Sequence, residues 1–316
     1  MRRLARKAQA GTALLTAMLI VALVASLAAA MVWRQYRAVE IEAADRARAQ
    51  SSWILQGALD WARLILREDA RANRNEPVDH LGEIWAVPLA EARLSTFLAA
   101  DRENAQDGPE AFLAGGIADA QAQYNLRNLL RPADAALEQR TLERLCENAG
   151  VPAETAGRLL TQLRAAFAEQ PDMATAPLRP RELDQLRWLG LSAETIERLR
   201  PFVTLLPTPT PVNLNTAPRE VIAALFDGMD LASAQRLVQV RKTAPFRNLE
   251  EAKTQLPQAV VLSAERASVA SNYFHVSGRL RLEERVLEER SLIRRRDLEM
   301  QVLSRQRVNL VLEAAR

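Results

Sequence analysis

The sequence predicts an α+β protein in which a long N-terminal helix packs on an antiparallel sheet, and a large all-helical region interrupts that sheet. Three observations support this class. Residues 12–56 contain neither Gly nor Pro, the two residues that interrupt helices. Between residues 131 and 200 apolar residues recur at helical spacing. After residue 271 apolar and polar residues alternate, as they do in strands exposed on one face.

The first part of the long helix is apolar enough to cross a membrane. Residues 12–33, from Thr12 to Trp33, carry no charge, and at about 1.5 Å per residue they reach roughly 33 Å, against a hydrocarbon core of about 30 Å. All cations of the leader, residues 1–11, precede this run, so the leader is expected inside the cell and the bulk outside. A secretory signal peptide cleaved near Ala28–Ala30 is the alternative, but the long apolar run and the helix that follows favour an anchor.

The second part of the helix, residues 34–72, is predicted to be amphipathic. Its apolar face has helical period and consists of Ile54, Ala58, Trp61 and Ile65, with Leu55, Leu59, Ala62 and Leu66 beside them. This face is expected to pack on the rest of the protein.

The remaining chain divides into sheet and helical segments. Residues 73–130 are assigned to the first part of the sheet, with extended structure expected from Ile117 to Leu130. Residues 131–204 form a first helical unit, and a Pro-rich connector opens a second helical unit at residues 205–268. Residues 269–316 return to the sheet, and Arg294–Arg296 is expected to be a solvated turn or face.

Composition narrows the function classes. The chain has 42 Lys plus Arg against 39 Asp plus Glu, but four of the cations lie in the leader, so the rest carries 38 against 39. The basic charge therefore belongs to the leader and does not indicate a nucleic-acid partner. The single cysteine, Cys146, cannot form an intrachain disulfide and is expected in the core. The two histidines, His80 and His275, form no catalytic or metal-binding pattern, so no enzyme is predicted.

The junction of leader and apolar run carries a family resemblance. The segment from Lys7 to Gly11, followed directly by Thr12, resembles the prepilin peptidase site of type IV pilins and type II secretion pseudopilins, where cleavage follows the Gly. Further matches point to the minor pseudopilins of the K type. They include Ser52-Trp53, Gly57, Trp85 within Gly82–Ala86, Asn125 and Asn128 within Tyr124–Leu129, Asn213 and Asn215 within Asn213–Pro218, and Ser271–Phe274.

Thr16 occupies the fifth position after the expected cleavage site. Most members of the pilin superfamily carry Glu there, and the K type resembles this chain in lacking it. A buried carboxylate in a bilayer costs about 2.5–3.5 kcal/mol at the helix centre and needs a cationic partner, so a subunit with Thr16 can enter a filament first. The alternative is that Thr16 is an ordinary membrane residue whose hydroxyl bonds the preceding turn.

The resemblance implies a pilin-like fold whose inserted helical units are SAM-like and similar to helix-hairpin-helix modules. It implies cleavage after Gly11, methylation of Thr12, and an inner-membrane protein with a cytoplasmic N-terminus and a periplasmic bulk. The expected role is the tip of the type II secretion pseudopilus and initiation of its assembly. The implied partners are the I, J and H type minor pseudopilins, the major pseudopilin, prepilin peptidase and the inner-membrane assembly platform.

The second helical unit offers a rival function. Its sequence from Val212 to Glu251 also resembles the helix-hairpin-helix domain of competence DNA-binding proteins, which bind phosphate at a helix N-terminus. Here Gly228 is retained, but Asp230 replaces the second Gly and Asp227 lies beside it, so two carboxylates would repel phosphate. A minor pilin of a type IV pilus is the other alternative, although it would ordinarily keep the Glu that Thr16 replaces.

One loop is a weak calcium candidate. Asp101, Glu103, Asn104, Asp107 and Gly108 are rich in oxygen ligands, but their spacing does not match an EF-hand. No cofactor follows from the residues themselves. The resemblance to the K type adds calcium as a candidate ligand, and a solvated loop is the alternative.

Overall fold

A computed structural model describes residues 9–94, 111–168, 176–258, 260–282 and 285–310. The chain forms two compact units, Met1–Ile54 and Leu55–Arg316, and helix α1 (Gln9–Ala72) runs through both. We describe each unit by itself.

The first unit is helical throughout its described residues. Its side chains from Leu14 to Ile41 are exposed, and the most apolar stretch has a mean hydropathy of 2.5, so this helix is long and apolar enough to cross a membrane. The hydroxyl of Ser26 donates to the carbonyl of Leu23 at 2.9 Å, which satisfies a polar group inside the helix. The apolar stretch therefore fits a membrane anchor.

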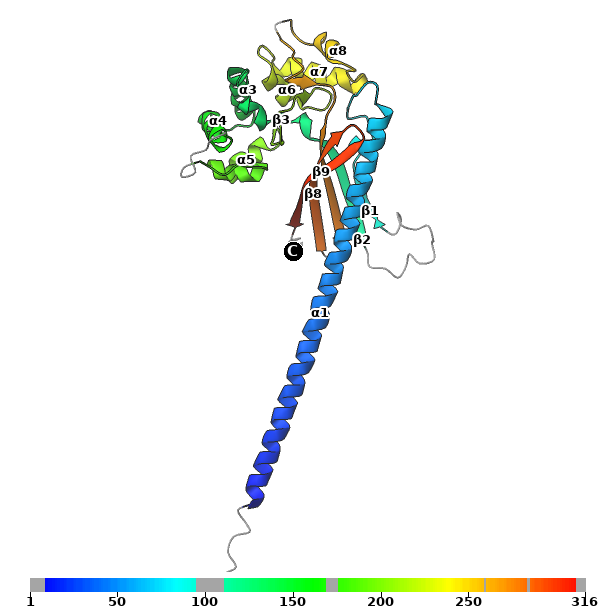
Figure 1. Ribbon diagram of the computed structural model, residues 1–316, viewed down its shortest axis with the longest axis vertical. Helices are drawn as coiled ribbons and strands as arrows, with labels where there is room; N and C mark the ends of the chain where they lie inside the picture. Colours follow the sequence, from blue (N-terminus) through cyan, green and yellow to red (C-terminus); the bar gives the residue numbers. More distant parts are fainter. Residues whose placement is uncertain (1–8, 95–110, 169–175, 259, 283–284, 311–316) are drawn as a thin grey trace, which may run out of the picture. The chain divides into compact units, whose positions relative to one another are not determined.

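The second unit contains a five-stranded antiparallel sheet in the order β1-β2-β7-β8-β9 (Figure 1). Its strands are β1 (Leu89–Arg93), β2 (Ala111–Asp119), β7 (Tyr273–Leu282), β8 (Arg285–Arg296) and β9 (Glu299–Leu310). β7 pairs with β2 from Phe274 opposite Asp119 to Leu282 opposite Ala111, although the whole helical region separates them in sequence.

The C-terminal part of α1 packs on one face of this sheet. The core there consists of Leu59, Ala62, Leu66, Trp85, Phe274, Val276, Ile293 and Met300. Burial of apolar surface is the main stabilising term for such a contact. The expected apolar face of the helix is confirmed for Leu55, Leu59, Ala62 and Leu66, which are all buried. It is wrong for Trp61, which lies beyond the edge of the contact and is 65% exposed.

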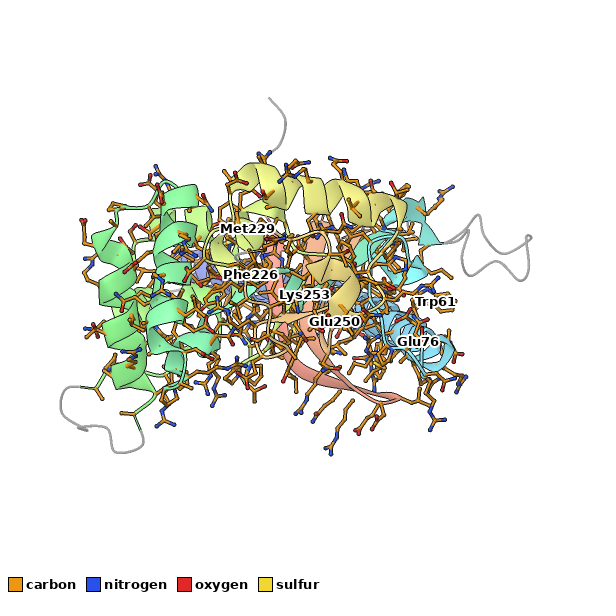
Figure 2. The ribbon with its side chains drawn as sticks, turned by 90° about the horizontal axis from the view of Figure 1, so that it is seen from above. Trp61, Glu76, Phe226, Met229, Glu250 and Lys253 are labelled. Carbon is orange, nitrogen blue, oxygen red and sulfur yellow. The ribbon has the colours of Figure 1, made fainter. Side chains whose placement is uncertain are left out.

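The inserted region is helical, as expected, and one continuous hydrophobic core runs through it from Tyr124 to Val269. Its elements comprise α3 (Ala135–Asn148), α4 (Glu154–Ala166), η4 (Leu183–Leu189), α5 (Ala193–Leu199), α6 (Arg219–Leu225), α7 (Leu231–Thr243) and α8 (Leu249–Lys253). Figure 2 labels Phe226 and Met229, which are buried in this core. Cys146 is also fully buried there as a free thiol, which confirms the expectation of a core residue.

A buried ion pair lies inside the same core. The hydroxyl of Tyr124 donates to Glu138 Oε2 at 2.7 Å, and Arg266 Nη1 lies 3.7 Å from Glu138 Oε1. Arg266 also donates to the hydroxyl of Thr141 at 2.9 Å. Removing one partner would leave the other charge buried and unpaired, which is strongly destabilising, so this pair ties α3 to the segment that leaves the insert.

One expectation about extended structure is wrong. Extended structure was expected from Ile117 to Leu130, but the strand ends at Asp119 and two 3₁₀ turns follow, η2 (Ala120–Ala122) and η3 (Leu126–Leu130), with the short strand β3 (Tyr124–Asn125) between them. The side chains of Asp119 and Asn125 accept hydrogen bonds from the backbone two residues ahead and so begin each turn.

Short parallel pairs complete the insert. β3 pairs with β4 (Val203–Thr204), and β5 (Val212–Asn213) pairs with β6 (Ala267–Ser268). The loop after α1 contains η1 (Ile84–Ala86), which buries Trp85 against Phe274 in an edge-to-face contact of 5.4 Å between ring centroids.

We predict that Gly115→Ala destabilises the sheet. A Cβ at Gly115 would lie 2.6 Å from the carbonyl oxygen of Ser277, so the strands β2 and β7 must separate. The expected loss is about 1–3 kcal/mol in the free energy of unfolding, measured by denaturant titration followed by circular dichroism. Gly57→Ala is the matched control, because its Cβ meets nothing within 4 Å and should stabilise α1 by up to about 1 kcal/mol. Equal effects of the two substitutions would contradict the close approach.

Candidate functional site

Asn213 stands at the centre of a buried polar junction between the sheet and the helical insert. Its side-chain amide donates to the backbone oxygen of Asp79, to Asp119 Oδ2 and to the hydroxyl of Ser271, each at 3.0 Å. These three partners come from the loop after α1, the end of β2 and the segment before β7. One amide therefore joins the chain where it enters and leaves the insert.

Arg295 extends this junction to the end of α1. Its guanidinium donates to Asp69 Oδ2 at 2.9 Å, to Asp79 Oδ2, and to the backbone oxygen of Ser271 at 2.6 Å. Arg295 is only 8% exposed, so the expectation that Arg294–Arg296 is a solvated turn or face is wrong for its middle residue. Strand alternation explains the difference, because Arg295 faces α1 while its two neighbours face the other way.

Glu83 fixes the turn that carries Trp85. Its carboxylate accepts from the indole nitrogen of Trp85 at 2.6 Å, from the backbone nitrogen of His80 at 2.9 Å and from the side chain of Asn73 at 2.9 Å. One oxygen each of Asp69, Asp79 and Glu83 lie within 4.8 Å of one another. Donors of the chain itself bind all three carboxylates, so this cluster forms part of the junction.

Burial in this junction raises the pKa of two aspartates, Asp69 and Asp119. Burial, together with the charges of Glu83 and Asp79, raises the pKa of Asp69 to about 7. Burial raises the pKa of Asp119 to about 6, against the hydrogen bonds from Thr216 and Ser271 that lower it. The junction therefore holds protons at a pH where exposed carboxylates hold none.

Asn125 and Asn128 hold the Pro-rich connector. Asn128 accepts from the backbone nitrogen of Thr210 at 3.0 Å and donates to its carbonyl at 2.9 Å, as a neighbouring strand would. Asn125 accepts from the backbone nitrogen of Leu206 at 3.1 Å and donates to the carbonyl of Thr208 at 2.7 Å. Because Pro has no N–H to donate, side-chain amides replace part of a strand ladder here.

The side-chain amide of Asn215 also replaces a backbone partner. It donates to the carbonyl of Phe246 and accepts from its backbone nitrogen, both at 2.9 Å. Thr216 does not cap the next helix: its hydroxyl donates to Asp119 Oδ2 at 2.5 Å, and Pro218 is the N-cap of α6. The family-motif residues Trp85, Asn125, Asn128, Asn213 and Asn215 are thus all buried. Sequence reasoning missed Asp79 and Asp119, which bind Asn213, and Arg295, which binds Asp79.

Trp53 differs from the other motif residues because it is 76% exposed. It belongs to the first unit. On the part of α1 in the second unit, Trp61, labelled in Figure 2, is 65% exposed and Leu64 is 36% exposed. Gly57 lies one turn before Trp61, and among the described residues nothing lies within 4 Å of where a Cβ of this residue would stand. Gly57, Trp61 and Leu64 recur at i, i+4 and i+7, so they lie on one face of the helix, which we call the exposed stripe.

The predicted processing site lies at the start of α1. Gly11 and Thr12 are helical, and their role in cleavage stays a prediction. The hydroxyl of Thr16 donates to the carbonyl of Ala13 at 3.0 Å, so the preceding turn of the helix accepts this donor. Asp101, Glu103 and Asp107, the calcium candidates, lie outside the described residues.

The helix-hairpin-helix segment has no free anion site at its hairpin. Gly228 has a φ of +78°, as a tight turn requires. Asp230 accepts from the backbone nitrogen of Ser233 at 2.7 Å and so occupies the N-terminus of α7. Asp227 is bound by Arg140, at 2.7 Å, and Arg144, which together lower its pKa to about 2. The two carboxylates that stand in place of a phosphate site therefore bind groups of the insert itself.

Comparisons with known proteins agree with this geometry. Residues 122–208 and 212–273 each match a family model described as type II secretion system protein K. Type II secretion system protein K of Pseudomonas aeruginosa is 29% identical over 304 residues, which cover 89% of this chain and 87% of that protein. The protein K of Klebsiella pneumoniae is 30% identical over 261 residues, covering 74% of this chain and 75% of that protein.

A solved structure shares the fold. The GspK-GspI-GspJ complex from the type 2 secretion system of enterotoxigenic Escherichia coli contains a chain that superposes with a TM-score of 0.63 at 22% identity. The match covers 84% of this chain and 99% of that chain.

A single long helix packed on an antiparallel sheet, with a helical insert between two paired strands, defines a pilin-like subunit. Within that class, the chain belongs to the type II secretion system protein K family and is a minor pseudopilin of that system. The competence DNA-binding protein and the type IV minor pilin are not favoured.

We predict that the folded protein loses stability as the pH rises from about 4 to 7. The pKa of Asp69 is about 7 when folded and about 4 when unfolded, so the folded state binds more protons across this window. Asp69→Asn should flatten this dependence, measured as the denaturant midpoint at pH 5 and pH 8. Asp60→Asn, at an exposed position of the same helix whose pKa is lowered, should leave it unchanged. A wild-type protein that is more stable at pH 8 would overturn the assignment.

Proposed function

We propose that this minor pseudopilin forms the tip of the periplasmic pseudopilus and initiates its assembly. It is cleaved after Gly11 by prepilin peptidase, methylated at Thr12, and held in the inner membrane by residues 12–33, with its bulk in the periplasm. Its role is structural and not enzymatic. Calcium remains a candidate ligand of the loop around Asp101.

The main observation in support of this proposal is the exposed stripe on α1. Trp61 is a large amphipathic side chain that is 65% exposed, and Trp is strongly enriched among residues that dominate binding energy at interfaces. Gly57 weakens a helix by about 1 kcal/mol relative to Ala, and no neighbour in the part of the chain that the structure describes accounts for it. A small residue beside a bulky one leaves a hole into which a side chain of a second helix can insert.

The partners proposed for this stripe are the I and J type minor pseudopilins. The support is the solved complex whose chain shares this fold, in which GspK assembles with GspI and GspJ. The H type, the major pseudopilin, prepilin peptidase and the assembly platform follow from the family resemblance. Thr16 adds support for an early position, since a subunit without a buried carboxylate needs no cationic predecessor in the membrane.

The helical insert supports the terminal position. Residues 120–272 form a bulky region between two adjacent strands of the sheet. A further subunit would have to stack on this region to extend the filament beyond it. The insert would therefore act as a cap.

Processing gives the first test. We expect mass spectrometry of the mature protein to find an N-methylated terminus at Thr12, and a Gly11→Leu variant to keep the full leader, because the peptidase no longer fits its site. A wild-type terminus near Ala29 or Met31 would mean a cleaved signal peptide and would overturn the anchored subunit.

The exposed stripe gives the second test. Trp61→Ala should weaken co-purification of the I and J type subunits by roughly tenfold or more, the loss typical of a central interface residue. Trp188→Ala is the matched control, because Trp188 is 48% exposed on η4 in the insert, away from α1. Circular dichroism should show that both variants stay folded. Equal binding by the Trp61 variant and the wild type would contradict the stripe as the docking surface.

A further inference from the structure

The first unit carries two arginines directly after its apolar stretch. Arg34 and Arg37 follow Trp33, the last residue of the uncharged run, and both are exposed on α1. They are three residues apart, so they are neighbours on the helix surface. Trp33 and Tyr36 lie among them and are 60% and 64% exposed. We call Trp33, Arg34, Tyr36 and Arg37 the flanking segment.

The two arginines of the flanking segment have no counter-charge. No carboxylate among the described residues forms an ion pair with either of them. The nearest carboxylate along the chain is Glu40, and it accepts a hydrogen bond from the hydroxyl of Tyr36, which raises the pKa of Tyr36. Arginines farther along the same helix pair with carboxylates one turn away: Arg46 with Glu42 and Arg48 with Asp45. The unpaired cations are therefore those at the end of the apolar stretch.

The position of the flanking segment corresponds to the headgroup layer of a bilayer. When the apolar stretch spans a hydrocarbon core of about 30 Å, the headgroup layer on each side is about 5–7 Å thick. Arg37 follows Trp33 by one helical turn, which is about 6 Å along the axis. Both guanidinium groups are therefore expected at the level of the lipid phosphates. Arg46 lies about 20 Å beyond Trp33 on the same helix, past the headgroups.

The side chains of the flanking segment also match the chemistry of a headgroup. The guanidinium of Arg37 lies 5.0 Å from the centroid of the Trp33 ring, a cation–π contact that holds the charge beside the end of the apolar stretch. Trp and Tyr are enriched where a helix crosses the boundary between membrane and water. Guanidinium groups bind phosphate oxygens with two parallel hydrogen bonds. A zwitterionic headgroup brings its own ammonium group, so an anionic phospholipid suits the arginines better.

Membrane topology does not explain these arginines. Lys and Arg near the ends of a span favour the cytoplasmic side. Arg34 and Arg37 therefore oppose the orientation that the cations of the leader set. A ligand for them on the side of the protein's bulk would offset this disadvantage.

We propose that the flanking segment binds the phosphate of an anionic phospholipid, in the leaflet on the side of the protein's bulk. This proposal rests on the membrane anchor of the proposed function and adds a lipid ligand to it. Arg34 and Arg37 donate to the phosphate oxygens, and Trp33 and Tyr36 lie against the glycerol region. The bound lipid fixes the depth of the helix in the bilayer, so a subunit that leaves the membrane for the filament must release it.

The test is native mass spectrometry of the full-length protein in detergent micelles. The micelles contain equal amounts of phosphatidylglycerol and phosphatidylcholine with the same acyl chains. We expect the wild type to retain mainly phosphatidylglycerol. The ratio of bound phosphatidylglycerol to phosphatidylcholine should fall about tenfold in the Arg34→Gln/Arg37→Gln variant, because two cations near an anionic headgroup are lost. The leader is the same in both proteins, so its cations contribute equally.

Arg46→Gln/Arg48→Gln is the matched control, because it removes the same charge from the same helix beyond the headgroups. It should keep the wild-type ratio, and an equal loss would reduce the effect to net charge and overturn the proposal. Glycerol 3-phosphate is offered in a parallel sample, and an adduct as abundant as the lipid would overturn the proposal in favour of a soluble phosphate site.

Two further outcomes separate the lipid site from the anchor. If the wild type and the Arg34→Gln/Arg37→Gln variant bind phosphatidylglycerol equally, the lipid site is wrong and the anchor stands. If neither lipid binds any of the proteins, the anchor itself is contradicted, and the lipid site with it.

Discussion

The rest of the second unit depends on Arg295, a buried guanidinium held by two aspartates. It joins Asp69 at the end of α1 to Asp79 in the following loop, and it also binds the backbone of Ser271, where the insert returns to the sheet. Taking these charges out of water is costly, and only close pairing and additional hydrogen bonds offset the cost. Asn213 adds those bonds from the insert side. Helix, sheet and insert are therefore parts of one polar network.

Much of the fold could be predicted from the sequence, because its largest signals are local. The absence of Gly and Pro over residues 12–56 predicted α1, and the helical spacing of apolar residues between 131 and 200 predicted helices such as α3. Alternation after residue 271 predicted strands. Leu59 and Leu66, which the local pattern assigns to a buried face, are buried in the structure, whereas Trp61 of the same predicted face is exposed.

The candidate site could be predicted only in part, because its partners are distant in sequence. Asn125, Asn128, Asn213 and Asn215 were singled out by resemblance, and spacing alone could not show that their amides replace backbone partners. Arg295 looked like a surface cation because two arginines flank it. The contact with Asp69 spans more than two hundred residues, and no periodic pattern encodes such a pairing.

The pairing of β2 with β7 has a consequence for how the chain folds. Joining Asp119 to Phe274 closes a loop of roughly 150 residues, and closing a flexible loop of that length costs about 4 kcal/mol in chain entropy. An insert that has already folded brings its two ends together through the parallel pairs β3–β4 and β5–β6, so little of this cost remains when the strands meet. The insert would then form first and the sheet would close late, since contacts between distant residues form slowly unless something shortens the path between them. The helical insert would thus be the nucleus around which the second unit's helix and sheet are completed.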